Sequence, residues 1–159
     1  MIQRIQSVYL MLVFLLACLM MFANPKFAAF KYQKSDKLSA EIRFVSNTFY
    51  NSGDPGVSTP KLINVLIITA TGVLAVAAIF MYKNTSLQKR FTLYTVILSV
   101  VLLVILFFDY NSIGGQRNDI SSYPGLHMIW PMASIVLGVL AWINIRRDEN
   151  LVNSMDRIR

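Results

Sequence analysis

The chain has 159 residues, of which 55% are hydrophobic and only 14% are charged. Soluble domains normally carry about a quarter charged residues, so the composition argues against an ordinary soluble protein. The formal net charge of +7 does not indicate nucleic-acid binding, because no basic run is interleaved with base-stacking aromatic residues. Most Lys and Arg residues flank apolar runs, where we expect membrane lipids to be their partners.

Four stretches of the chain contain no Asp, Glu, Lys or Arg. As a helix rising 1.5 Å per residue, each is about long enough to cross a hydrocarbon core of about 30 Å. We therefore predict an all-α membrane protein that forms one domain over residues 1–159. The predicted transmembrane helices cover residues 5–24, 62–82, 91–109 and 124–146.

The first apolar run admits three interpretations. A cleaved signal peptide would need a small-x-small cleavage site, which the run lacks. The segment 15–18, Leu-Leu-Ala-Cys, resembles a bacterial lipobox, but apolar residues continue past Cys18 where a lipoprotein turns polar. An uncleaved helix is favoured, and Asn24 before Pro25 ends it because proline disfavours helix in the preceding residue.

The outer loop at residues 25–61 has the alternation of β-strands. Apolar and polar residues alternate over 30–33 and again over 38–44, with a polar segment between them that can turn. This period of two predicts a small β-hairpin between the first two helices. A lone hairpin is marginally stable in water, so we expect it to pack on the end of the bundle or on a partner.

Two of the predicted helices carry small residues on one face. Small side chains let helices approach closely in lipid, and simple abundance of alanine is the alternative explanation. We expect the two faces to pack against each other, and their candidate residues are Thr71, Ala75 and Ala78 in the second helix and Ser134, Gly138 and Ala141 in the fourth.

The tail at residues 148–159 has helical spacing of apolar residues. Leu151, Met155 and Ile158 recur at i, i+4 and i+7, which predicts a short amphipathic helix. Such a helix either lies on the membrane surface or docks on a protein partner.

Basic residues decide the predicted orientation. An even number of spans places both termini on one side, and the positive-inside rule gives most weight to short loops and span-flanking charges. The basic loop at residues 83–90 and the pair Arg146 and Arg147 therefore predict cytoplasmic termini.

The sequence offers little for catalysis, metal binding or ion transport. With one His and one Cys, the chain lacks a cluster of metal ligands, and we expect no cofactor. Asp109 and His127 form one weak candidate polar pair, but His127 also fits as an interfacial residue beside Trp130. No predicted span has a charge at mid-membrane, which disfavours ion transport. We therefore expect a protein that is not an enzyme.

The two ends of the chain resemble those of a known family. The segments MIQRIQSVYL at residues 1–10 and IRRDENLVNSMDRIR at residues 145–159 resemble the domain of unknown function 4293 family, four-helix membrane proteins of Bacteroidota. The resemblance implies a bacterial inner-membrane location, with the hairpin in the periplasm. It implies no known activity, so it assigns no functional residue.

Two functions from different classes remain open. The first hypothesis is a non-catalytic inner-membrane protein that acts as a subunit or assembly factor of an envelope complex. Its contact surfaces with protein partners would be the hairpin and the tail. The alternative is a protein that binds or transports a lipid or a small apolar molecule between its helices.

Overall fold

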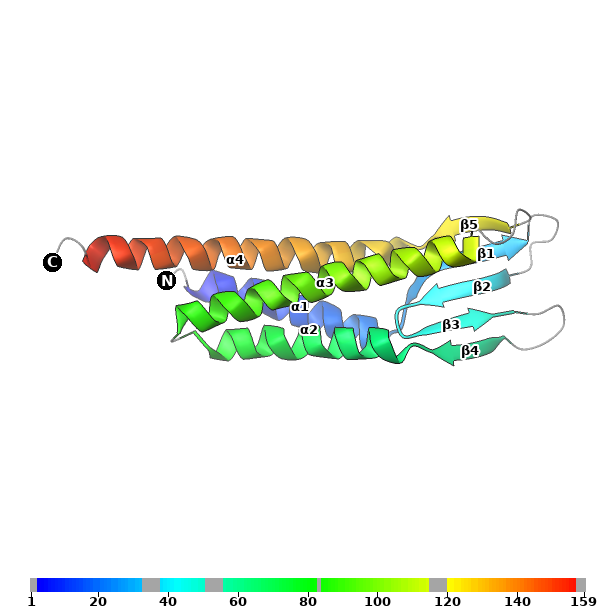
Figure 1. The fold of residues 1–159 in the computed structure, drawn as a ribbon, viewed down its shortest axis with the longest axis horizontal. Coiled ribbons are helices and arrows are strands. Elements are labelled where there is room, and N and C mark those ends of the chain that lie inside the picture. The colour runs from blue at the N-terminus through cyan, green and yellow to red at the C-terminus, as the bar shows by residue number, and fades with distance from the viewer. Residues whose placement is uncertain (1–2, 33–37, 51–55, 83, 115–119, 157–159) are drawn as a thin grey trace.

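The computed structural model of the chain describes residues 3–32, 38–50, 56–82, 84–114 and 120–156. Four long helices lie side by side, and a β-sheet lies at one end of them (Figure 1). The helices are α1 (Gln3–Phe22), α2 (Leu62–Phe80), α3 (Thr85–Gly114) and α4 (Ile129–Asp156). We call the end with the sheet the sheet end, and the opposite end, where α1 begins and α4 ends, the termini end.

All four helices are long and apolar enough to cross a membrane, as predicted. The 19 residues of α2 make a rise of about 28 Å, which matches a hydrocarbon core of about 30 Å. Large apolar side chains cover the outer surface of the bundle, among them Val8, Phe14, Val73, Ile97, Val104 and Val136. A soluble protein rarely exposes so much contiguous apolar surface, whereas lipid would cover it.

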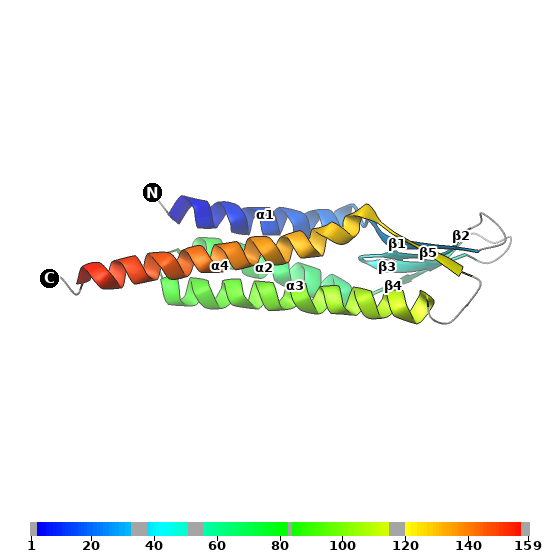
Figure 2. The ribbon, with the colours of Figure 1, turned by 90° about the horizontal axis from the view of Figure 1, so that it is seen from above.

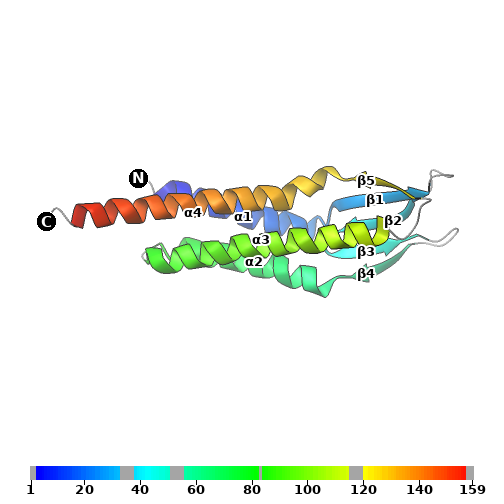
Figure 3. The ribbon, with the colours of Figure 1, turned by 45° about the horizontal axis from the view of Figure 1, so that its top comes forward.

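Each helix packs against two neighbours, in the cyclic order α1, α2, α3, α4. Figure 3 shows α2 beside α3 and α4 beside α1. The helices α2 and α4 therefore lie on one diagonal of the bundle, and α1 and α3 on the other.

The extramembrane part is larger than the predicted hairpin. Its five strands are β1 (Lys26–Tyr32), β2 (Leu38–Arg43), β3 (Ser46–Phe49), β4 (Val57–Pro60) and β5 (Ile120–Pro124). They form one antiparallel sheet in the order β4-β3-β2-β1-β5. The first two strands are the predicted ones, and their connection at 33–37 lies outside the described residues. The prediction of an all-α protein with one hairpin missed three of these strands, and one of them, β5, comes from the segment between α3 and α4.

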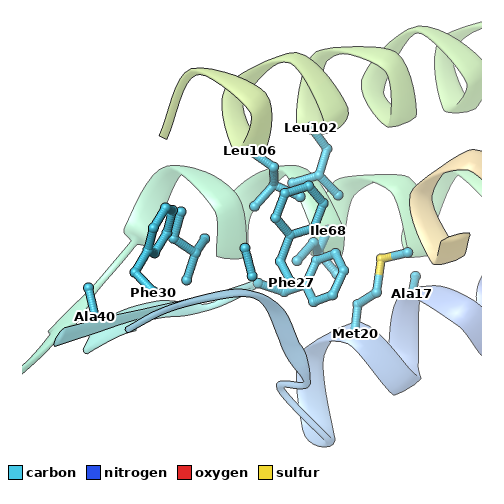
Figure 4. Close-up of a cluster of buried hydrophobic side chains, with 11 residues drawn as sticks. Ala17, Met20, Phe27, Phe30, Ala40, Ile68, Leu102 and Leu106 are labelled. Carbon is cyan, nitrogen blue, oxygen red and sulfur yellow. The ribbon is translucent and has the colours of Figure 1, made fainter. Parts of the chain in front are cut away.

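One face of the sheet is continuous with the core of the bundle. Phe30 pairs with Ala40 across β1 and β2, and both are buried in one cluster with Leu102 and Leu106 of α3. Figure 4 shows these two leucines above the sheet, with Ala17 and Met20 of α1 in the same cluster. The expectation that the strands pack on the end of the bundle is therefore confirmed.

Two helices extend further than the sequence indicated. α3 continues past Asp109, its predicted end, to Gly114, and this extension lies beside the sheet (Figure 1). Residues 148–156 are helical, but they continue α4 without a break instead of forming a separate tail helix. Figure 2 shows that the end of α4 projects beyond the other three helices.

The junction between β5 and α4 requires glycine at position 125. The backbone N–H of Gly125 donates to the carbonyl of Phe27 at 2.9 Å. A Cβ atom there would lie 2.5 Å from the carbonyl oxygen of Lys26 and 2.9 Å from that of Phe27. The two backbones therefore approach too closely for any other residue.

We predict that Gly125→Ala lowers the free energy of unfolding by about 1–3 kcal/mol, the usual cost of overpacking. Thermal unfolding in one detergent measures the effect. The control is Gly72→Ala, whose Cβ would lie 3.6 Å from Cβ of Ala17, an ordinary contact. Alanine in the helix should leave stability unchanged or raise it by up to about 1 kcal/mol. Equal stability of the two variants would contradict the prediction.

Candidate functional site

The corner between β2 and β3 connects the sheet to the bundle. The N–H of Val45 donates to Oδ1 of Asn24 at 2.9 Å, and the N–H of Lys61 donates to the carbonyl of Val45 at 2.8 Å. The carbonyl of Phe44 accepts from Nδ2 of Asn64 at 3.1 Å. Three backbone groups of the corner are thus bonded to the end of α1 and the start of α2, and we call residues 44–45 the corner.

Asn24 has a left-handed backbone conformation at the end of α1. Its φ of 39° lies in the left-handed region, which asparagine tolerates better than most residues. This turn directly after α1 directs its side chain to the corner, where Nδ2 also donates to Oγ of Ser46 at 3.3 Å. The sequence predicted the end of the helix here, but not the role of the side chain.

Aromatic rings attach the corner to α4. The ring of Phe44 stacks on Trp130 with centroids 6.4 Å apart, and it meets the ring of Phe27 edge-on at 5.9 Å. The ring of His127 contacts Trp130 edge-on at 4.9 Å. Aromatic residues of mixed polarity are typical of a membrane–water boundary, so this cluster suits the sheet end of the bundle.

The structure gives the two members of the weak polar pair different partners. Lys61, the residue directly before α2, donates a hydrogen bond to the carboxylate of Asp109 and forms a salt bridge with it. His127 lies against Trp130, as the interfacial interpretation expected. Since Asp109 lies within α3 and pairs with α2, this carboxylate stabilises helix packing where the bundle meets the sheet.

Glu41 is buried on the opposite face of the sheet. Its side chain is only 1% exposed, and by strand alternation it points away from the face that holds Ala40 and Ile42. Burial raises the pKa of Glu41, but hydrogen bonds and charges from Lys26 and Arg43 outweigh burial, so the pKa lies below its ordinary value of 4.5. Arg43 lies 3.0 Å from the carboxylate. The three side chains form an ion cluster in which the carboxylate is buried and Lys26 and Arg43 are partly exposed.

The small-residue faces of α2 and α4 both point into the bundle. All six candidate residues are buried: Thr71, Ala75, Ala78, Ser134, Gly138 and Ala141. The direct packing that we expected between the two faces stays a prediction, because α2 and α4 are diagonal and each makes its main helix contacts with α1 and α3. Gly138 lies against Val96 of α3, whose Cγ2 would be 2.7 Å from an added Cβ.

At the termini end, α4 carries the polar contacts. Nζ of Lys89 lies 2.8 Å from Oε2 of Glu149, and Nε2 of Gln6 donates to Oδ2 of Asp148. The guanidinium of Arg146 lies over the ring of Trp142, 5.5 Å from its centroid, a typical interfacial anchor. The contacts of Lys89 and Gln6 join this part of α4 to α3 and α1.

The tail residues are described only in part. Leu151 is 51% exposed on the projecting end of α4. Met155 belongs to the helix, but its side chain lies outside what the structure describes, and so does all of Ile158. The predicted apolar stripe therefore stays a prediction.

In the described part of the chain, no three His, Cys, Asp or Glu side chains come together. The side chains that sequence reasoning missed are Asn24, Glu41 and Asn64. Asn64 offered a signal, because it is a lone amide within an apolar run. Such a group needs a hydrogen-bond partner when it is buried in lipid.

Together, four helices that are long and apolar enough to cross a membrane and one attached antiparallel sheet define the architecture of this chain. The chain matches the family model described as domain of unknown function DUF4293 over residues 2–158. It therefore belongs to this family, as its two ends indicated. No curated protein matches the chain.

We predict that Asn64→Ala lowers the free energy of unfolding by about 1–3 kcal/mol, because it leaves the buried carbonyl of Phe44 without its partner. Thr69→Val in the same helix is the control, since the hydroxyl of Thr69 bonds only to carbonyls of its own helix. Thermal unfolding of both variants in one detergent measures the difference. If both unfold at the same temperature, the corner does not depend on Asn64.

Proposed function

We propose that this protein is a non-catalytic subunit or assembly factor of an envelope complex in the bacterial inner membrane. In this model both termini are cytoplasmic and the sheet is periplasmic. The observation that carries the proposal is the presence of a structured projection at each end of the bundle. One is the sheet, fixed by the corner, and the other is the end of α4, which continues beyond α1, α2 and α3 (Figure 2).

The sheet offers an edge for a protein partner. β4 is an edge strand, and all four of its residues are exposed, with Val57 at 67%. Phe49, its neighbour across the ladder, is also exposed. An exposed edge with apolar side chains can pair with a strand from another chain, and this feature supports a role in assembly.

The centre of the bundle gives less support to the alternative function. Sites for small molecules usually enclose roughly 300–1,000 Å³. The cavity among the four helices has a volume of about 10 Å³, which is too small for a lipid chain or an apolar ligand. A protein partner therefore explains the described surfaces better than an internal ligand does.

Orientation is tested by a reporter fused after Arg159. We expect a reporter that works only in the cytoplasm to be active, because the basic pairs Lys89–Arg90 and Arg146–Arg147 flank the spans at the termini end. The same reporter inserted within residues 51–55, which follow β3 and precede β4 in the chain, should be inactive. If the inserted reporter is active and the C-terminal fusion is inactive, both termini lie in the periplasm and the proposed orientation is wrong.

Partner binding is tested by photo-crosslinking in native membranes. A photoreactive residue at Val57 or at Leu151 should form adducts with another protein, because these residues lie on the sheet edge and on the projecting end of α4. The matched control is Val73, an apolar residue of α2 that is also 67% exposed and should crosslink to lipid. Only lipid adducts at all three positions would refute the proposal and favour the alternative.

A further inference from the structure

A small cavity lies at the centre of the four-helix bundle. Its lining combines apolar side chains, such as Val13, Ala17 and Leu102, with Thr71 of α2, Ser99 of α3 and Ser134 of α4. The volume of about 10 Å³ is at the lower limit for one water molecule, which needs about 10–15 Å³. Wholly apolar cavities of this size stay dry, but this one has a hydroxyl residue from each of three helices.

The three hydroxyl groups are available as acceptors. Each donates its proton to a carbonyl of its own helix: Thr71 to Ile67 at 2.7 Å, Ser99 to Thr95 at 3.0 Å and Ser134 to Pro131 at 2.8 Å. A hydroxyl oxygen has two lone pairs in addition to its proton. Two of these oxygens can therefore accept the two hydrogens of one water molecule, and two hydrogen bonds are the lower end of the range for buried waters.

The inward face of α3 carries polar side chains between the termini end and this cavity. Gln88, Thr92, Thr95 and Ser99 are all at most 3% exposed, and they follow one another at helical spacing from the termini end to the cavity. Beyond the cavity, the same face continues with Leu102 and Leu106, which are buried against the sheet. The polar residues of this face therefore lie on the termini side of the cavity, where Leu10 of α1, Ala78 of α2 and Ala141 of α4 form an apolar cluster.

A buried acceptor lies at the termini end of the bundle. Oδ1 of Asp148 is inaccessible to solvent and has no hydrogen-bond partner among the described residues. The other oxygen of the same carboxylate accepts from Gln6, which is itself buried. Buried acceptors without protein partners are commonly satisfied by ordered water, so the termini end of the bundle is also suited to hydration.

We infer that the central cavity is a binding site for one water molecule, which donates one hydrogen to Thr71 and the other to Ser134, lies beside Ser99, and is supplied from the termini end along α3. The water links α2 to α4, which lie on one diagonal of the bundle. The inference goes beyond the proposed function, because it concerns the interior of the bundle and not its contact surfaces.

Water-edited solid-state NMR of the protein in lipid bilayers tests this inference. Magnetisation from water should reach Thr71 and Ser99 as fast as it reaches residues at the ends of the helices, and Leu106 should lag behind. Signals of Thr71 and Ser99 that lag as Leu106 does would overturn the water site. Slow transfer to Thr92 and Thr95, with fast transfer to Ser99, would overturn the route along α3.

A substitution provides the second test. Ser99→Val removes one hydroxyl and adds bulk at the cavity, so Thr71 should lose its fast transfer from water. The control Thr69→Val, which also replaces a hydroxyl that bonds within its own helix, should leave transfer to Thr71 unchanged. Fast transfer to Thr71 in the folded Ser99→Val protein would show that water reaches it by another way and would overturn the site.

Discussion

The structure depends on the hydrogen bonds of backbone groups where the sheet meets the ends of the helices. The corner at residues 44–45 is buried at Phe44, and buried backbone groups need hydrogen-bond partners from the protein itself. Asn24, Lys61 and Asn64 supply them. Because these partners belong to the end of α1 and the start of α2, one short segment fixes two helix ends and the sheet together.

The sheet and the bundle share one core. Leu102 and Leu106 belong to a helix that is long and apolar enough to cross a membrane, yet they are buried in the same cluster as Phe27 and Phe30 of the sheet. The 30-residue length of α3 makes this possible, since a span of lipid uses only about 20 residues. The rest of the helix supports the strands, so the sheet is not an independent domain.

Local sequence predicted the parts of the fold that local physics determines. Charge-free runs identified the four helices, because lipid excludes charge along the full length of a span. Alternation identified β1 and β2, where one face is buried and the other polar. β5 was missed because Ile120–Pro124 has little alternation and becomes a strand only by pairing with β1.

The neighbours of each helix face could not be predicted either. Small residues at Thr71 and Gly138 indicated which face is buried, but the identity of the neighbour depends on the order of helices around the bundle. Likewise, Arg146 and Arg147 indicated where the membrane ends but not where the helix ends, because charged residues continue a helix readily. The contacts of the corner were beyond prediction, since they join residues from three separate segments.

The position of β5 constrains the order of biogenesis. β1 follows the first helix in the chain, but its neighbour β5 follows the third. During synthesis, the edge of β1 that β5 covers therefore stays unpaired until three helices have been made and placed. A chain in which the segment after α3 is misplaced would leave β1 with an open strand edge over residues Ala28 to Tyr32.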